Sequence, residues 1–216
     1  MSLKGILGLG AYSTQYYLGE IQRKFKERNK EFSTCPYLLY QIDFQEINPF
    51  LPDQFLILKP KVELVLNEIY ELGISNLLVP NITLHETLDQ IETPVKLYHP
   101  VNLAMDHLVK NRISNVTVFG TLYTMNSQYL RKIFSENNIE IMLPSNKDQK
   151  WLDDFRKAVF EQNCNENQIK TFQDLITEYS HKNPVLISCT ELSVFAFKNN
   201  PDCIDMADLQ IEEFLK

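Results

Sequence analysis

The sequence contains no block of lysine and arginine, and its 28 acidic residues outnumber its 21 basic ones, which gives a net charge of −7. Proteins that bind nucleic acid or anionic membrane surfaces present a basic patch, so this composition argues against both kinds of partner. The chain also lacks any apolar run near the roughly 18–20 residues that a membrane-spanning helix needs. We therefore expect the partner to be a small molecule.

Signals for export, metal binding and disulfide bonding are missing as well. The amino end runs directly into a strand-like apolar segment without the long hydrophobic region of a signal peptide, which predicts a cytoplasmic protein. The four cysteines show no C-x-x-C spacing and the four histidines no H-E-x-x-H pattern, so we expect neither a metal site nor a disulfide framework. With six glycines, ten prolines and 44% hydrophobic residues, the composition is that of an ordinary globular protein.

Short apolar runs alternate with longer amphipathic stretches along the chain. We predict strands over 3–9, 37–42, 77–79, 94–98, 115–119, 139–143, 185–187 and 203–205. We predict helices over 14–30, 60–72, 101–111, 125–136, twice within 147–181, and over 206–215, with a long loop at 43–59. This alternation predicts an α/β fold in which parallel sheets are flanked by helices.

An internal repeat divides the chain into two halves. Each half opens with a glycine turn after a strand, at Gly10 or Gly120, and closes with a polar cluster at the end of a later strand, at Asn81 or Cys189. The repeat predicts two similar lobes, with an active-site cleft between them in which Asn81 and Cys189 face each other. We assign residues 1–99 to the first lobe, with segment 204–216 as a candidate to complete it, and residues 100–203 to the second.

The apolar run 185–187 ends abruptly at Ser188, Cys189, Thr190 and Glu191. Ligands of open α/β sheets bind beyond the carboxyl ends of the strands. A free cysteine is most often a small apolar filler, but here it precedes a threonine that can bind a carboxylate and an acid that can hold a neighbouring group or merely begin a helix. A helix starting near Thr190 would favour the thiolate, because its amino end carries partial positive charge. Cys189 is therefore the candidate reactive residue.

Polar residues also follow the two glycine turns. Ser13 and Thr14 come after Gly10 at the predicted start of a helix, which suits a carboxylate as well as a phosphate, although the full G-x-G-x-x-G fingerprint and a P-loop lysine are missing. Thr121 and Thr124 come after Gly120. Proton transfer at a stereocentre needs groups on opposite faces of the substrate, with hydroxyl and amide donors around the developing carbanion. The sequence offers such donors.

Four segments resemble the aspartate/glutamate racemase family, whose two-lobed members work without a cofactor. G-L-G-A-Y-S-T at 8–14 is similar to the family's G-M-G-P-x-A-T, and G-T-L-Y-T-M at 120–125 to G-T-x-x-T-M. S-C-T-E-L at 188–192 is similar to G-C-T-E-L, where the cysteine is a catalytic base, and Ile204-Asp205 before a helix also fits. The resemblance implies a homodimeric amino-acid racemase or isomerase, in which Cys189 transfers the Cα proton and the carboxylate donors are Thr14, Thr83, Thr121 and Thr190.

The remaining segment departs from the family pattern. The family's P-C-N-T-x-H is P-N-I-T-L-H at 80–85, so Asn81 stands where the first catalytic cysteine is expected, while Thr83 and His85 are kept. An amide is no base, so His85 or a water molecule would have to return the proton to the other face. The arginine that family members use for acidic substrates corresponds to Gln54, which cannot form an ion pair.

Three functions stay open on these residues. The first is an isomerase of the racemase type that acts on a small carboxylate such as an amino acid. The second is a single-cysteine decarboxylase of a malonate-type acid, for which one proton delivery suffices. The third is a catalytically inactive relative that binds a carboxylate ligand or a partner.

Overall fold

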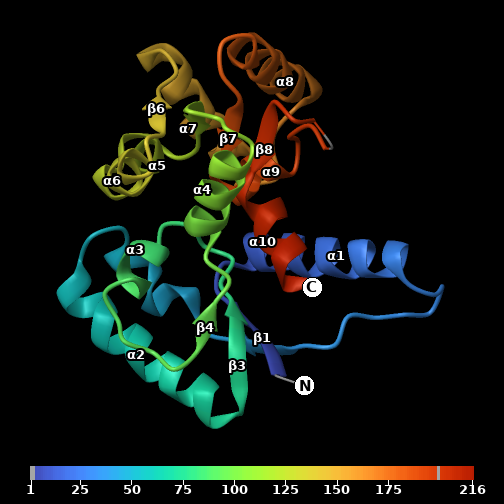
Figure 1. Ribbon diagram of the computed structural model, residues 1–216, viewed down its shortest axis with the longest axis vertical. Coiled ribbons are helices and arrows are strands. Elements are labelled where there is room, and N and C mark those ends of the chain that lie inside the picture. The colour runs from blue at the N-terminus through green and yellow to red at the C-terminus, as the bar shows by residue number, and fades with distance from the viewer. Residues whose placement is uncertain (1–2, 199) are drawn as a thin grey trace. The chain divides into compact units, whose positions relative to one another are not determined.

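The computed structural model describes residues 3–198 and 200–216, which form two units (Figure 1). Unit 1 comprises the residues up to His99 together with Gln210–Lys216, and unit 2 comprises Pro100–Leu209. The segment that returns to unit 1 thus begins at Gln210 and not at residue 204. The reason is that strand β8 (Cys203–Asp205) pairs with strand β7 of the second sheet. Residues 1 and 2 of the expected first lobe lie outside the described residues.

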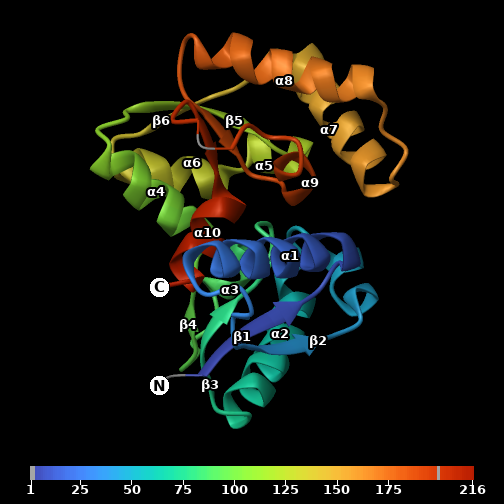
Figure 2. The same cartoon turned by 90° about the vertical axis from the view of Figure 1, so that its right-hand side faces the viewer.

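Unit 1 is built on a parallel sheet of four strands in the order β2-β1-β3-β4. Its elements are β1 (Leu3–Gly8), α1 (Ala11–Arg28), β2 (Leu38–Gln41), the 3₁₀ turns η1 (Phe44–Glu46) and η2 (Asn48–Phe50), α2 (Phe55–Glu71), β3 (Ile74–Leu78), α3 (His85–Leu88) and β4 (Lys96–Leu97). Helices α1 and α2 cover opposite faces of this sheet (Figure 2). A parallel sheet covered on both faces needs apolar strands, and the last residues of β1 are accordingly buried.

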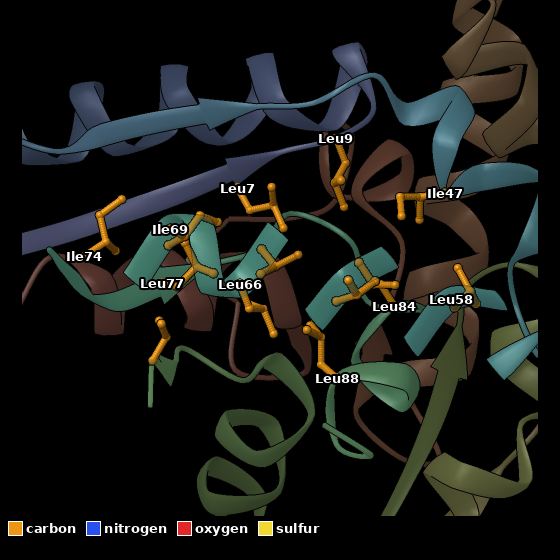
Figure 3. Close-up of a cluster of buried hydrophobic side chains, with 13 residues drawn as sticks. Leu7, Leu9, Ile47, Leu58, Leu66, Ile69, Ile74, Leu77, Leu84 and Leu88 are labelled. Carbon is orange, nitrogen blue, oxygen red and sulfur yellow. The ribbon is translucent and has the colours of Figure 1, made fainter. Parts of the chain in front are cut away.

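The hydrophobic core of unit 1 lies between the sheet and α2. Helix α2 buries Leu58, Val62, Leu66 and Ile69, a spacing that places them on one face of a helix. Figure 3 shows Leu58 and Leu66 in one cluster with Leu7 from β1, Leu77 from β3 and Leu88 from α3. Burial of each such side chain contributes about 1.5–3 kcal/mol, so the core fixes α2 and the end of β3 relative to the sheet.

Unit 2 repeats the same strand order, β6-β5-β7-β8, again with all strands parallel. Its elements are α4 (Pro100–Lys110), β5 (Asn115–Phe119), α5 (Leu122–Asn126), α6 (Gln128–Glu136), β6 (Glu140–Met142), α7 (Asn146–Phe160), α8 (Glu166–Ser180), β7 (Val185–Ile187), α9 (Thr190–Ser193) and β8, and α10 (Met206–Phe214) follows. The predicted α/β class with two parallel sheets is confirmed. The predicted cleft concerns the relation of the two units and stays a prediction.

Two predicted elements differ from the structure for identifiable reasons. The loop predicted at 43–59 contains the two 3₁₀ turns and the start of α2, because Pro60 lies inside the helix and not in its first turn. The helix predicted at 125–136 is divided at Ser127, whose backbone is extended and whose hydroxyl accepts from the Leu130 amide. Among the described residues, no helix is long and apolar enough to cross a membrane.

Candidate functional site

The carboxyl end of β7 carries the residues that the sequence marked as reactive. Ser188 continues the strand, and its amide and hydroxyl both donate to the Phe119 carbonyl, at 2.8 and 2.9 Å. Cys189 follows with an extended backbone and directly precedes the four-residue helix α9. Both Cys189 and Thr190 are buried, with 6% of each residue exposed. The thiol is therefore held in a fixed position at the strand end.

The Cys189 thiol donates a hydrogen bond to the Glu191 carboxylate, with 2.9 Å between Sγ and Oε2. Burial raises the pKa of Cys189 well above its usual range, and the negative charge of Glu191 raises it further, whereas the charge of Arg156 acts in the opposite direction. The expectation that a helix amino end stabilises the thiolate is therefore wrong. A single turn of helix is outweighed by burial and a facing carboxylate, so the resting form is a thiol hydrogen-bonded to Glu191.

Exchanging Glu191 for glutamine is expected to shift alkylation of Cys189 to lower pH, because the carboxylate that disfavours the thiolate is removed. Iodoacetamide labelling of Cys189, followed by mass spectrometry across a pH series, measures this shift. Glu178→Gln, an exposed acid on α8, serves as the control and should leave the profile unchanged. An unchanged profile in Glu191→Gln would show that the hydrogen bond does not govern the thiol.

The turn after β5 lies beside β7 because the two strands pair. The Thr121 hydroxyl oxygen accepts from the Thr124 amide at 3.0 Å and lies 2.8 Å from the Thr124 hydroxyl. One hydroxyl proton of this pair joins the two oxygens, so the other remains to donate elsewhere. These two predicted binding residues thus lie at the same sheet edge as Cys189 and Thr190.

Gly120 makes room for Ser188, the residue before Cys189. A Cβ atom at position 120 would lie 2.3 Å from the Ser188 hydroxyl oxygen. Gly120→Ala is therefore expected to destabilise the protein by about 1–3 kcal/mol, because Ser188 must move away from the Phe119 carbonyl. Urea unfolding measures this change. The clash should disappear in Gly120→Ala/Ser188→Ala.

Gly19→Ala provides a matched control for that substitution. Nothing lies within 4 Å of a Cβ atom at Gly19, which is inside helix α1. Alanine should stabilise a helix interior by roughly 0.5–1 kcal/mol relative to glycine. If Gly120→Ala behaves like Gly19→Ala, the close approach of Ser188 is not a constraint on the site.

A second acid supports the Cys189 segment from β8. The Asp205 carboxylate lies 2.8 Å from the Ser193 hydroxyl and also accepts from the Ala207 amide at 2.9 Å. The Ser193 hydroxyl oxygen is 3.2 Å from the Cys189 carbonyl oxygen. Burial raises the pKa of Asp205, although the charge of Lys198 opposes this. Asp205 and Ser193 therefore hold the turn that presents Cys189.

Sequence reasoning missed the ionic cluster on α7, the helix that packs against both α5 and α9. Asp153 is buried and accepts from the Leu122 amide at 3.2 Å and from Arg156 Nε at 3.1 Å. Burial alone would raise the pKa of Asp153, but the hydrogen bonds from Lys157 and Leu122 and the charge of Arg156 lower it. The signal was present as an acid with cations three and four residues later, a spacing that places them on one helix face.

In unit 1 the hydroxyl groups that follow the glycine turn after β1 form hydrogen bonds with backbone groups of the same turn. Thr14 is buried, and its hydroxyl oxygen accepts from the Leu9 amide at 3.1 Å. The Ser13 hydroxyl donates to the Gly10 carbonyl at 3.1 Å. Each residue thus shapes the start of α1, while the Thr14 hydroxyl proton is not used by the bond from Leu9.

The end of β3, which pairs with β1, brings Asn81, Thr83 and His85 to the same edge of the first sheet. The Asn81 side-chain oxygen accepts from the Leu84 amide at 2.9 Å, and its carbonyl oxygen lies 2.8 Å from Nδ1 of His85. A carbonyl only accepts, so Nδ1 carries the proton and Nε2 has a lone pair. Thr83 is half-buried.

His85 is fully buried, and its ring meets that of His99 edge to face with 4.6 Å between the ring centres. Burial and the facing His99 lower the pKa of His85 to about 3, so its ring is neutral. Among the described residues, Nε2 of His85 has no hydrogen-bond partner. His85 is therefore better suited to holding the Asn81 turn in place than to transferring protons to a ligand.

Gln54 is exposed directly before α2, with its amide 3.5 Å from the Pro49 carbonyl. Within the described part of the chain, no group of three or more histidine, cysteine, aspartate or glutamate side chains is arranged to hold a metal ion. The structure thus gathers the predicted residues into one cluster at the strand ends of each unit. Whether Asn81 faces Cys189 stays a prediction.

The fold of nearly the whole chain occurs in solved structures of amino-acid racemases. An aspartate racemase homologue from Pyrococcus horikoshii matches with a TM-score of 0.83 at 21% identity, over 99% of this chain and 97% of that one. The aspartate racemase of Picrophilus torridus gives 0.77 at 16% identity, over 98% and 91%. A glutamate racemase from Bacillus anthracis gives 0.59 at 16% identity, over 98% and 79%. No protein-family model and no curated protein matches the sequence.

Proposed function

We propose that this chain, which has the fold of aspartate and glutamate racemases, is a cofactor-independent racemase or isomerase of a small amino acid. The observation that carries the proposal is the Cys189 thiol, buried at a strand end and hydrogen-bonded to Glu191. A homodimeric, cytoplasmic enzyme is part of the same proposal. It rests on the family resemblance and on the composition of the chain.

Proton transfer begins with the pair formed by Cys189 and Glu191. Glu191 takes the thiol proton, and the resulting thiolate removes the Cα proton of the substrate, which makes Cys189 a thiol again. The electron pair left on Cα spreads into the substrate carboxylate. Donors for that carboxylate are Thr190 and the unused hydroxyl proton of the Thr121 and Thr124 pair.

In this proposal Asn81 binds the substrate and does not act as a base. Its side-chain oxygen is already used by the Leu84 amide, so its NH₂ group is left to donate to a substrate carboxylate. The proton for the opposite face then comes from a water molecule, because His85 is buried and neutral, and the hydroxide that remains takes the proton held by Glu191. Inversion should therefore be slower than exchange of the Cα proton.

One observation favours a second function, decarboxylation of a malonate-type acid. The raised pKa of Cys189 makes it a proton donor at rest, and a decarboxylase needs a single proton delivery. Loss of carbon dioxide leaves the electron pair on Cα, the thiol gives its proton to that carbon, and the thiolate regains a proton from solvent. No second base is required.

A panel of substrates in heavy water separates these functions. We expect aspartate, glutamate or a neutral amino acid to gain one deuterium at Cα, detected by mass spectrometry, with slower formation of the other enantiomer on chiral chromatography. Release of carbon dioxide from substituted malonates without amino-acid exchange would favour the decarboxylase. Absence of both reactions would leave a carboxylate-binding protein and contradict the enzymatic proposal.

A further inference from the structure

A buried acid fixes Arg156 at the strand ends of unit 2. One oxygen of Asp153, Oδ1, accepts from both the Leu122 amide and Arg156 Nε, at 3.2 and 3.1 Å. Leu122 is the second residue after Gly120, in the turn that follows β5. Since Asp153 is only 4% exposed, this shared oxygen ties the arginine side chain to that turn.

Two carboxylates, Asp153 and Asp154, balance the charges of Arg156 and Lys157. The second oxygen of Asp153 pairs with Lys157, which also lies 3.6 Å from the Asp154 carboxylate. The neighbouring pair formed by the Cys189 thiol and the Glu191 carboxylate carries one negative charge. Binding of an anion here therefore depends on the remaining N–H groups of Arg156 and not on an excess of local positive charge.

The guanidinium of Arg156 has N–H donors that no group in the described part of the chain uses. Nε is used by Asp153, whereas neither Nη1 nor Nη2 has a partner among the described residues, and 29% of the side chain is exposed. Two parallel N–H groups match the two oxygens of a carboxylate, which makes arginine well suited to bidentate binding. A phosphate would fit the same donors, but the proposed Cα chemistry calls for an acid.

We infer that Arg156 binds a carboxylate group of the substrate, held in place by Asp153 at the turn after β5. This inference rests on the proposed function and names the part of unit 2 that selects an acidic substrate. Gln54, the position that the family resemblance assigned to substrate charge, lies in unit 1 and carries no charge. In this inference the negative charge of the substrate is bound by Arg156 on α7, the helix that packs against α9, and not by Gln54.

Isothermal titration calorimetry with L-aspartate, L-asparagine and succinate tests this inference on the wild type and on Arg156→Gln. We expect Arg156→Gln to weaken L-aspartate binding at least roughly tenfold, since a hydrogen bond to a charged group is involved. Arg156→Lys, which keeps the charge, should retain part of the affinity, and Lys150→Gln, an exposed cation on the same helix, should retain all of it. Thermal unfolding of each variant checks that the fold is intact.

The arms of the titration separate the two carboxylates of aspartate. If Arg156→Gln weakens aspartate and not asparagine, Arg156 binds the side-chain carboxylate; equal weakening assigns it to the α-carboxylate. Unchanged binding in Arg156→Gln, or no binding of any of the three ligands to the wild type, overturns the inference. Binding that depends on Arg156 without any Cα exchange would instead contradict the proposed function alone.

Discussion

Serine in place of Cys189 is expected to lower the rate of Cα proton exchange by roughly 10²–10⁴-fold, the usual contribution of a positioned acid or base. The hydroxyl keeps the shape of the thiol and its hydrogen bond to Glu191, but it is a far weaker acid. Ligand binding should persist, because the donors on Thr121, Thr124 and Thr190 are untouched. Exchange rates measured by mass spectrometry in heavy water, at saturating substrate, give the size of the loss.

Cys203→Ser is the matched control for that substitution. Cys203 is also a buried free cysteine in the second sheet, but it lies at the beginning of β8 and not at a carboxyl end. Its replacement should leave exchange within a few-fold of the wild type. If Cys189→Ser retains full exchange while Cys203→Ser does not, the reactive thiol has been misassigned.

Unit 1 is expected to lose stability steeply as the pH falls from about 6.5 toward 4, because its buried His85 must stay neutral. The folded-state pKa of His85 is lowered to about 3, from an ordinary value of 6.5, by burial and by the facing His99. Between these pH values, His85 therefore binds a proton in the unfolded chain and stays neutral in the folded chain. The stabilisation is fully present above pH 6.5 and declines by about 1.4 kcal/mol for each pH unit below it.

His85→Gln isolates this contribution, since glutamine can donate to the Asn81 carbonyl but does not titrate. Urea unfolding between pH 7 and pH 4 should give a steeper loss of stability for the wild type than for His85→Gln. His181→Gln, at an exposed histidine, is the control and should follow the wild type. Parallel curves for the wild type and His85→Gln would contradict the burial argument.

Much of the fold follows from local patterns in the sequence. The strand over 185–187 and the polar cluster after it are found where expected, because an apolar run that stops at small polar residues has few other arrangements in a parallel sheet. The boundaries of α2 could not be predicted from Pro60. A proline inside a helix is tolerated where packing of residues such as Leu58 and Leu66 compensates for the lost hydrogen bond.

The site was less predictable, because its electrostatics depend on burial. The sequence places Glu191 two residues after Cys189, but only the structure gives the direction of the thiol hydrogen bond and the burial that opposes ionisation. The charged stretch of α7 is typical of a solvent-exposed helix. Asp153 is buried there because Leu122, Arg156 and Lys157 together satisfy its charge; the spacing indicates the two cations, but not the contact with Leu122 or the burial.

The central claim is that Cys189 exchanges the Cα proton of an amino acid with solvent. Proton NMR in heavy water, with the L and D forms of aspartate, glutamate and a few neutral amino acids, tests it most directly. The account predicts that the Cα signal of at least one substrate disappears with wild-type protein and persists with Cys189→Ser. A Cα signal that persists for every substrate, or that disappears equally with Cys189→Ser, would contradict it.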